Sequence, residues 1–136
     1  MKIYLNTGIQ DGYRSLGNKI KMENKKFILR IRLRDKYIFQ AIKNGNKKVD
    51  TRAASTRNRS IKTGDKLILI CGKEKIERKV KGVRVFKTIS ALLKKYKPQQ
   101  INPKTFSEKE ITKMYYSFPG YKEKIKKYGL IVIELK

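Results

Sequence analysis

The apolar residues of this chain occur in short runs, and glycines and lysines interrupt the runs. The clearest is residues 67–71, a continuously apolar segment bounded by Gly64 and Gly72. Runs of this length are typical of buried strands, and all fall well short of the about 18 apolar residues of a membrane span. We therefore expect a domain built from several short strands, with no transmembrane segment.

Periodicity predicts the order of these elements along the chain. Residues 27–34 alternate apolar and basic side chains, as a half-buried strand does. Further strands are expected at 47–53, 67–71, 76–86 and 130–135, and helices at 36–43, 89–96, 108–116 and 121–128. Gly82 predicts a bulge, and residues 67–71 should form the most buried strand. The order favours an α+β fold, a small mixed β-barrel of about five to six strands flanked by short helices.

The 136 residues fit one domain. Residues 1–24 carry three glycines, scattered apolar side chains and no sustained period. We interpret this segment either as a leader or as a short strand at residues 3–5 that pairs with a sheet edge. The predicted domain covers residues 25–136.

Positive charge is the outlying property of the composition. Thirty-six Lys and Arg residues against eleven Asp and Glu residues leave a formal net charge of +25. Such a charge opposes compaction, so a polyanionic partner is the natural explanation, although lysine-rich solvated faces alone would look similar. Histidine is absent and Cys71 is the one cysteine, which excludes an internal disulfide, a Cys/His zinc site and Ser-His-Asp chemistry. We expect a cytoplasmic monomer with no metal and no cofactor.

The most informative stretch is residues 43–59, which carries the pattern Gly45-x-Lys47-x-x-Asp50-x-Arg52. Lys47 and Arg52 are suited to the anionic part of a ligand, and Asp50 is spaced to orient Arg52 on one strand face. Lys47, crowded by cations, would serve as a base if burial lowered its pKa. The competing interpretation is a surface ion pair worth roughly 0–1 kcal/mol.

Polar side chains dominate the segment that follows, residues 54–60, which we predict to be a mobile loop. Arg57 and Arg59 carry guanidinium groups of the kind that contact phosphate, and Lys62 lies in the next turn. A second feature is a group of aromatic residues around the break at residues 117–120. Its members would either stack unpaired bases or belong to the core: they are Tyr115, Tyr116, Phe118 and Tyr121.

The pattern through Arg52 resembles the G-x-K-x-x-E-x-R signature of ASCH domains, a branch of the PUA-like superfamily. The turn at residues 61–65, the strand through Gly82, the helix with Leu92 and Leu93, the break at 118–120 and the closing strand are also similar. The resemblance spans residues 27–136. It implies a five- or six-stranded barrel whose signature lines a cleft, and it implies RNA binding.

Some small bacterial members of that family look like amidohydrolases that act on N4-acetylcytidine with a Lys, a Thr and a distant Glu. Lys47 matches the Lys, Asp50 stands where the Thr would be, and the region of the Glu falls near Pro103 and Lys104. We therefore predict a module that binds single-stranded or structured RNA, or a modified nucleotide. The predicted contact residues are Lys47, Lys48, Asp50, Arg52, Arg57, Arg59 and Lys62.

Two other functions stay open at this point. One is a small enzyme, either an amidohydrolase on a modified nucleoside or a metal-independent ribonuclease, in which Lys47 would act with Asp50 or a tyrosine. The other is a structural basic protein without a pocket.

Overall fold

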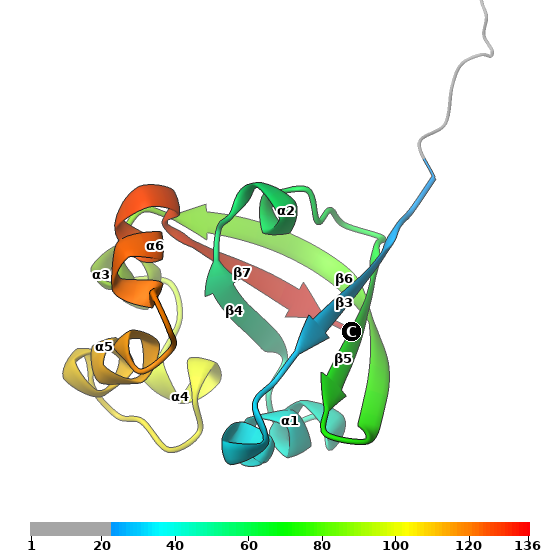
Figure 1. Cartoon of the computed structure of the whole chain (residues 1–136), viewed down its shortest axis with the longest axis horizontal. Helices are drawn as coiled ribbons and strands as arrows, with labels where there is room; N and C mark the ends of the chain where they lie inside the picture. Colours follow the sequence, from blue (N-terminus) through cyan, green and yellow to red (C-terminus); the bar gives the residue numbers. More distant parts are fainter. Residues whose placement is uncertain (1–22) are drawn as a thin grey trace, which may run out of the picture.

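The computed structural model describes residues 23–136, which form a five-stranded mixed sheet with short helices (Figure 1). The strand order is β3 (Lys26–Arg30), β5 (Lys66–Cys71), β6 (Glu74–Phe86), β7 (Leu130–Leu135) and β4 (Val49–Ala53). β3 runs parallel to β5, and the other neighbours are antiparallel. The α+β class and the five strands are thus confirmed. The leader and the strand at 3–5 lie, apart from residues 23 and 24, outside the described residues.

β6 is long enough to pair with β5 along its first half and with β7 along its second. The register shifts between the halves: Val80 faces Leu135, whereas Gly82, two residues later, faces Glu134, which is only one residue away from Leu135 in β7. Lys81 is therefore the extra residue of a β-bulge, as Gly82 predicts. A Cβ at Gly82 would lie 3.2 Å from a carboxylate oxygen of Glu134.

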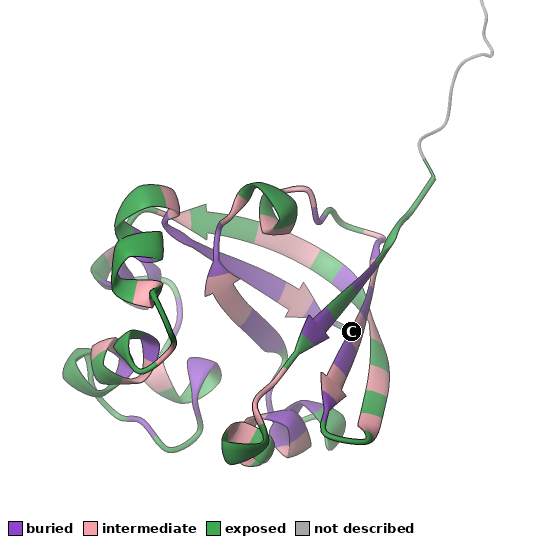
Figure 2. Ribbon diagram, viewed as in Figure 1, coloured by how far each residue is buried: buried purple, intermediate pink, exposed green. Residues whose placement is uncertain are grey.

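β7 separates two hydrophobic clusters and is buried on both faces (Figure 2). Ile131, Ile133 and Leu135 pack against β3, β5 and α1 (Lys36–Lys43), whereas Leu130 and Val132 pack against the helices. The prediction that residues 67–71 form the most buried strand is wrong. β5 alternates between buried and half-buried residues, whereas five of the six residues of β7 are buried.

Helix bounds agree well with the local signals. α1 (Lys36–Lys43), α5 (Glu108–Tyr116) and α6 (Tyr121–Tyr128) begin and end where predicted. The Ser107 side chain accepts a hydrogen bond from the backbone of Glu110, and Gly129 ends α6 with a positive φ. α3 (Ile89–Leu93) is shorter than expected, and α4 (Pro98–Ile101) lies in a predicted connection.

The prediction of a mobile loop at residues 54–60 is wrong, because the segment contains helix α2 (Thr56–Arg59). Ser55 caps this helix by accepting a hydrogen bond from the backbone of Asn58. The Asn58 side chain in turn donates to the carbonyl of Ala53 over 2.9 Å. Polar bonds from side chain to backbone thus order a segment that lacks a large apolar anchor.

β3 and β4 form the two outer edges of the sheet, and no ladder joins them among the described residues. Two arginines bridge the gap instead. Arg52 donates to the carbonyl of Arg30, and Arg57 donates to the carbonyl of Ile28, each over 3.0 Å. Strand pairing therefore leaves the sheet open, although a closed barrel was expected. No helix within residues 23–136 has the length and apolar character needed to cross a membrane.

Candidate functional site

A cavity of about 240 Å³ is lined by residues from the end of β3, from β4 and from the helices. Its walls combine four groups of side chains, drawn from several parts of the fold. Lys47, Asp50 and Arg52 form the polar floor, and Phe118 and Tyr121 form an aromatic wall. The remaining apolar lining comes from Ile31, Ile38, Ile101 and Met114, and the rim carries Arg30, Arg32 and Asp35.

Asp50 and Arg52 form a tight ion pair on the floor, with 2.8 Å between Arg52 Nε and Asp50 Oδ2. Residues two apart on a strand share a face, so β4 holds both groups in register. Their side chains are only 6% and 17% exposed, which makes this a largely buried pair and not the solvated surface pair considered above. Burial lowers the pKa of Arg52, but the Asp50 carboxylate outweighs that effect and raises it overall.

Lys47 precedes β4 and is only 4% exposed. Its ammonium group donates a hydrogen bond to the carbonyl of Val49. Burial lowers the pKa of Lys47 to about 8; Asp50 acts to raise this pKa and Arg52 to lower it further. The amine of Lys47 therefore titrates close to neutral pH, as a base of this type requires.

The aromatic group divides between core and cavity. Tyr115 is fully buried, and its hydroxyl lies 2.5 Å from Thr51 Oγ1, so it belongs to the core. Tyr121 stacks on Tyr115 with ring planes 9° apart, and Phe118 meets Tyr121 edge-on with 5.0 Å between ring centroids. Tyr116 is 46% exposed and does not line the cavity. Burial raises the pKa of Tyr115, so its hydroxyl keeps its proton.

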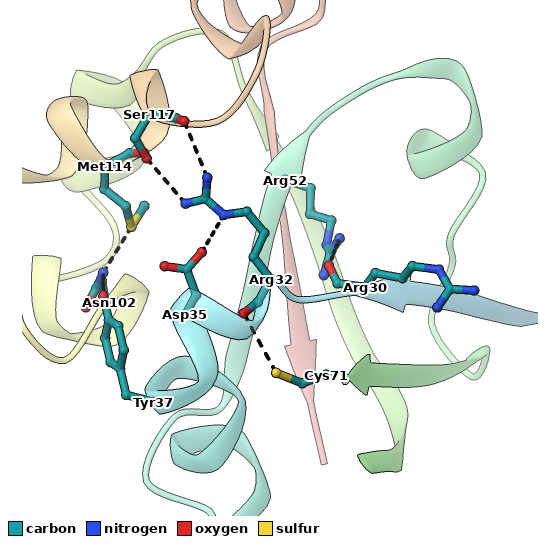
Figure 3. A network of polar contacts seen from close by, with 9 residues as sticks. All are labelled: Arg30, Arg32, Asp35, Tyr37, Arg52, Cys71, Asn102, Met114 and Ser117. Atoms are coloured by element: carbon teal, nitrogen blue, oxygen red, sulfur yellow. Dashed lines mark hydrogen bonds and ion pairs between the residues drawn. The ribbon is translucent and has the colours of Figure 1, made fainter. Parts of the chain in front are cut away.

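Arg32 links the two sides of the cavity mouth (Figure 3). Its Nε lies 2.7 Å from Asp35 Oδ2, and its guanidinium lies 4.3 Å from the centre of the Phe118 ring. Two longer bonds of 3.4 Å reach Ser117. Asp35 stands at the N-cap position of α1, but its side chain makes no cap bond and accepts a hydrogen bond from Arg32 instead.

Four of the seven predicted contact residues lie outside this cavity. Lys48 is exposed and lines a neighbouring hollow. Arg57 bonds to β3, and Arg59 donates to the carbonyls of Ala54 and Tyr128 over 2.9 and 2.7 Å. Lys62 is exposed in the turn before β5. The structure therefore brings together Lys47, Asp50 and Arg52, but not the other four.

Sequence reasoning missed Arg30, Arg32 and Asp35 as members of the site. The available signal was the run of arginines on the polar face of residues 27–34, which precedes a carboxylate. The contact between Arg32 and Phe118 joins segments 86 positions apart, so no local pattern could reveal it.

The cavity is equipped to bind, with no evident metal chemistry among residues 23–136. In that range, no three carboxylate or thiol groups lie together as a metal ion would require. Both carboxylates that line the cavity are paired with arginines. Hydrogen-bonding groups below, an aromatic wall beside them and cations at the mouth suit a flat polar ring with an anionic substituent.

The chain resembles two solved structures over most of its length. The crystal structure of hypothetical protein PH0355 has a TM-score of 0.68 and 35% sequence identity, and the match covers 82% of this chain and 97% of that one. The solution NMR structure of protein PF0455 from Pyrococcus furiosus has a TM-score of 0.62 and 26% identity, with 84% and 96% covered. Neither name states a function. Comparisons with protein-family profiles and with curated proteins give no match.

Proposed function

We propose that this chain, which belongs to the same protein family as hypothetical protein PH0355, binds single-stranded RNA and holds one unpaired nucleotide in the cavity described above. One observation carries the proposal: an ammonium, a carboxylate and a guanidinium group share the floor of a cavity with an aromatic wall. Burying such groups is costly for a small domain, and perturbed ionisable groups in a cleft are typical of functional sites.

Each part of the cavity has a use in this proposal. The base lies against Phe118 and Tyr121, because every base has a face that stacks on aromatic rings. Asp50 accepts a hydrogen bond from the base, and Lys47 donates one. The phosphate is attracted by Arg30, which is exposed at the mouth. The net charge of +25 supplies the general attraction to the polyanion.

Single-stranded RNA, or a single-stranded part of a structured RNA, fits better than a duplex. The cavity volume of about 240 Å³ lies below the roughly 300–1,000 Å³ of drug-sized ligand sites, so it suits one base. In an A-form helix the bases are stacked and the major groove is too deep and narrow for side chains to read. Unpaired nucleotides can instead be turned out and bound individually.

We also propose that the fold is of the PUA-like type found in ASCH domains. The position of the signature supports this, because β4 directs Asp50 and Arg52 into the cavity. The barrel of that family would correspond here to the curved sheet whose outer edges Arg52 and Arg57 bridge.

A pair of matched aromatic substitutions tests the proposed function. Phe118→Leu removes an aromatic face from the cavity, whereas Tyr116→Leu removes one that is outside it. We expect Phe118→Leu to weaken binding of a fluorescent single-stranded RNA by about 1–3 kcal/mol, measured by anisotropy, and Tyr116→Leu to have little effect. Equal affinities for both variants and the unmodified protein would contradict the proposal.

The lowered pKa of Lys47 favours one second candidate, an amidohydrolase on a modified nucleoside such as N4-acetylcytidine. In its neutral form this amine would act as the base, and Asp50 would take the place of the family's Thr. Neither Pro103 nor Lys104, the region expected for the distant Glu, lines the cavity, and Asp35 is the one other carboxylate in its lining. A ribonuclease would use the same Lys47.

Turnover separates these candidates from binding alone. An enzyme would release acetate from N4-acetylcytidine, or cleave labelled RNA, and Lys47→Met would abolish the reaction. The binding module that we propose gives no product in either assay. In these assays, Lys47→Met should change the affinity of that module for RNA and leave the absence of product unchanged.

A further inference from the structure

Lys48 was predicted to contact RNA beside Lys47, but it lies in a second hollow. This hollow has a volume of about 270 Å³ and lies between the end of α1, the middle of β6 and the C-terminal end of β7. We call it the basic hollow and define it by its four cationic residues other than Lys47, namely Lys48, Arg78, Lys81 and Lys136. Among the described residues, no Asp or Glu side chain lines it. Within residues 23–136, none of the four forms a salt bridge.

The fold assembles these cations from separate elements. Lys81 is the extra residue of the β6 bulge, and bulges commonly re-aim a side chain. Arg78 is held at the end of α1, where it donates to the carbonyls of Lys43 over 3.1 Å and Ile42 over 3.5 Å. Gly45 lines the hollow with a φ of +86°, and a Cβ there would meet nothing within 4 Å, so space remains open.

Like charges that gather around a hollow repel one another unless an anion neutralises them. A few surface cations are offset elsewhere, as where Glu74 pairs with both Lys36 and Lys43. Within residues 23–136, no Asp, Glu or aromatic side chain lines the basic hollow, so it is suited to phosphate and not to base stacking.

Lys47 lines both the basic hollow and the cavity that contains Asp50 and Arg52. One residue thus separates the two. We propose that the basic hollow binds backbone phosphate of the same RNA strand whose nucleotide occupies the cavity, so that the strand passes over the turn at residues 44–46. This inference rests on the proposed RNA binding and adds a second contact site and a path for the strand.

The test compares two double variants with the same change of charge. Lys48→Gln with Lys81→Gln alters the basic hollow, whereas Lys94→Gln with Lys95→Gln alters exposed residues that line neither hollow. For a single-stranded oligonucleotide at low salt, we expect the first pair to weaken binding roughly tenfold and the second pair less than about twofold. The slope of log affinity against log salt should fall by about 0.7 for each phosphate that the protein no longer neutralises, in the first pair only.

A nucleoside monophosphate serves as the second probe, because it occupies the cavity without reaching the basic hollow. Its affinity should be the same in both double variants and reduced in Phe118→Leu. Equal losses of oligonucleotide affinity and equal slopes in the two double variants would overturn the inference while leaving the cavity intact. If Phe118→Leu changed the affinity neither for the oligonucleotide nor for the nucleoside monophosphate, the proposed function would be wrong. The proposed path of one strand through the cavity and the basic hollow would then be wrong as well.

Discussion

Strand β4 and helix α2 are neighbours in the sequence and both carry arginines, yet they use them differently. On β4, Arg52 is 17% exposed and pairs with a buried carboxylate inside a cavity. On α2, Arg57 and Arg59 are exposed and donate to backbone carbonyls of β3, Ala54 and Tyr128. Arg52 thus both lines the cavity and, through the carbonyl of Arg30, bridges to β3, whereas Arg57 and Arg59 lie outside the cavity and join segments of backbone.

In a very basic protein, the role of a cationic side chain thus depends on how deeply it is buried and on whether it bonds to a carboxylate or to a backbone carbonyl. A guanidinium bonded to a carbonyl in solvent contributes mostly through that bond, which is worth about 1.5–3 kcal/mol when fully formed and less when exposed. A guanidinium paired with a buried carboxylate cannot be removed alone, because the carboxylate is left without compensation. The following predictions test this distinction.

The largest effect is expected for Arg52→Ala. The substitution leaves the 6%-exposed Asp50 side chain unpaired and removes one bridge to β3, so we expect a loss of about 3 kcal/mol in the free energy of unfolding. Urea denaturation measures it. As a control, Asp50→Asn with Arg52→Gln removes both charges together and should cost less than Arg52→Ala alone. A loss below about 1 kcal/mol for Arg52→Ala would show that the pair behaves like a surface pair.

A similar magnitude, with a defined pH window, is expected for Lys47. The folded pKa of about 8 lies below the ordinary 10.5. Below about pH 8, Lys47 is protonated in both the folded and the unfolded protein, and its buried charge lowers stability. Between about pH 8 and 10.5 only the unfolded protein keeps this proton, so the free energy of unfolding rises with pH. Relative to Lys47→Met, the unmodified protein should gain about 3 kcal/mol across this window.

Urea denaturation from pH 7 to 10.5 checks this, with the exposed Lys48→Met as the matched control. The stability difference between the unmodified protein and Lys48→Met should stay nearly constant over the same range. A constant difference for Lys47→Met as well would contradict the burial of a titrating amine at this position.

Smaller losses are expected on α2. Arg59→Ala removes two bonds to carbonyls, and we expect a loss of about 1–2 kcal/mol in stability; Arg57→Ala removes one and should lose about 1 kcal/mol or less. Thermal or urea unfolding measures both. The sequence-based expectation that these arginines contact RNA stays a prediction. The double variant Arg57→Ala with Arg59→Ala tests it. If the slope of log RNA affinity against log salt fell strongly in this variant while its stability changed little, these arginines would contact RNA, and the contrast with Arg52 would be weaker.

Much of the fold followed from local signals. Alternation located β3, although the predicted strand continued to residue 34 and β3 ends at Arg30. Ser107 marked the start of α5, Gly129 the end of α6, and Gly82 the bulge. These features depend on near neighbours in the chain, so one sequence suffices to predict them. The burial of β7 on both faces could not be predicted, because it depends on helices that pack from the other side.

The site was predicted in part for the same reason. Lys47, Asp50 and Arg52 lie on one short segment whose strand spacing is readable from the sequence. Arg32 enters the site through Ser117 and Phe118, and Lys48 lies in the second hollow, where its carbonyl accepts a hydrogen bond from the backbone of Leu135. Both outcomes depend on long-range packing. Helix α2 was missed because it has no apolar period: side-chain hydrogen bonds order it, one to the nearby carbonyl of Ala53 and one to the distant carbonyl of Tyr128.

The most direct test of the central claim compares stability and RNA affinity in Lys47→Met at pH 7. Methionine fills a similar volume without charge. The urea concentration at the midpoint of unfolding should therefore be at least as high for the variant as for the unmodified protein. It should nevertheless bind a short single-stranded RNA at least about tenfold more weakly, because the charged donor on the cavity floor is gone. Lys94→Met, on the exposed surface, should change neither quantity. Unchanged RNA affinity in a folded Lys47→Met variant would contradict the account.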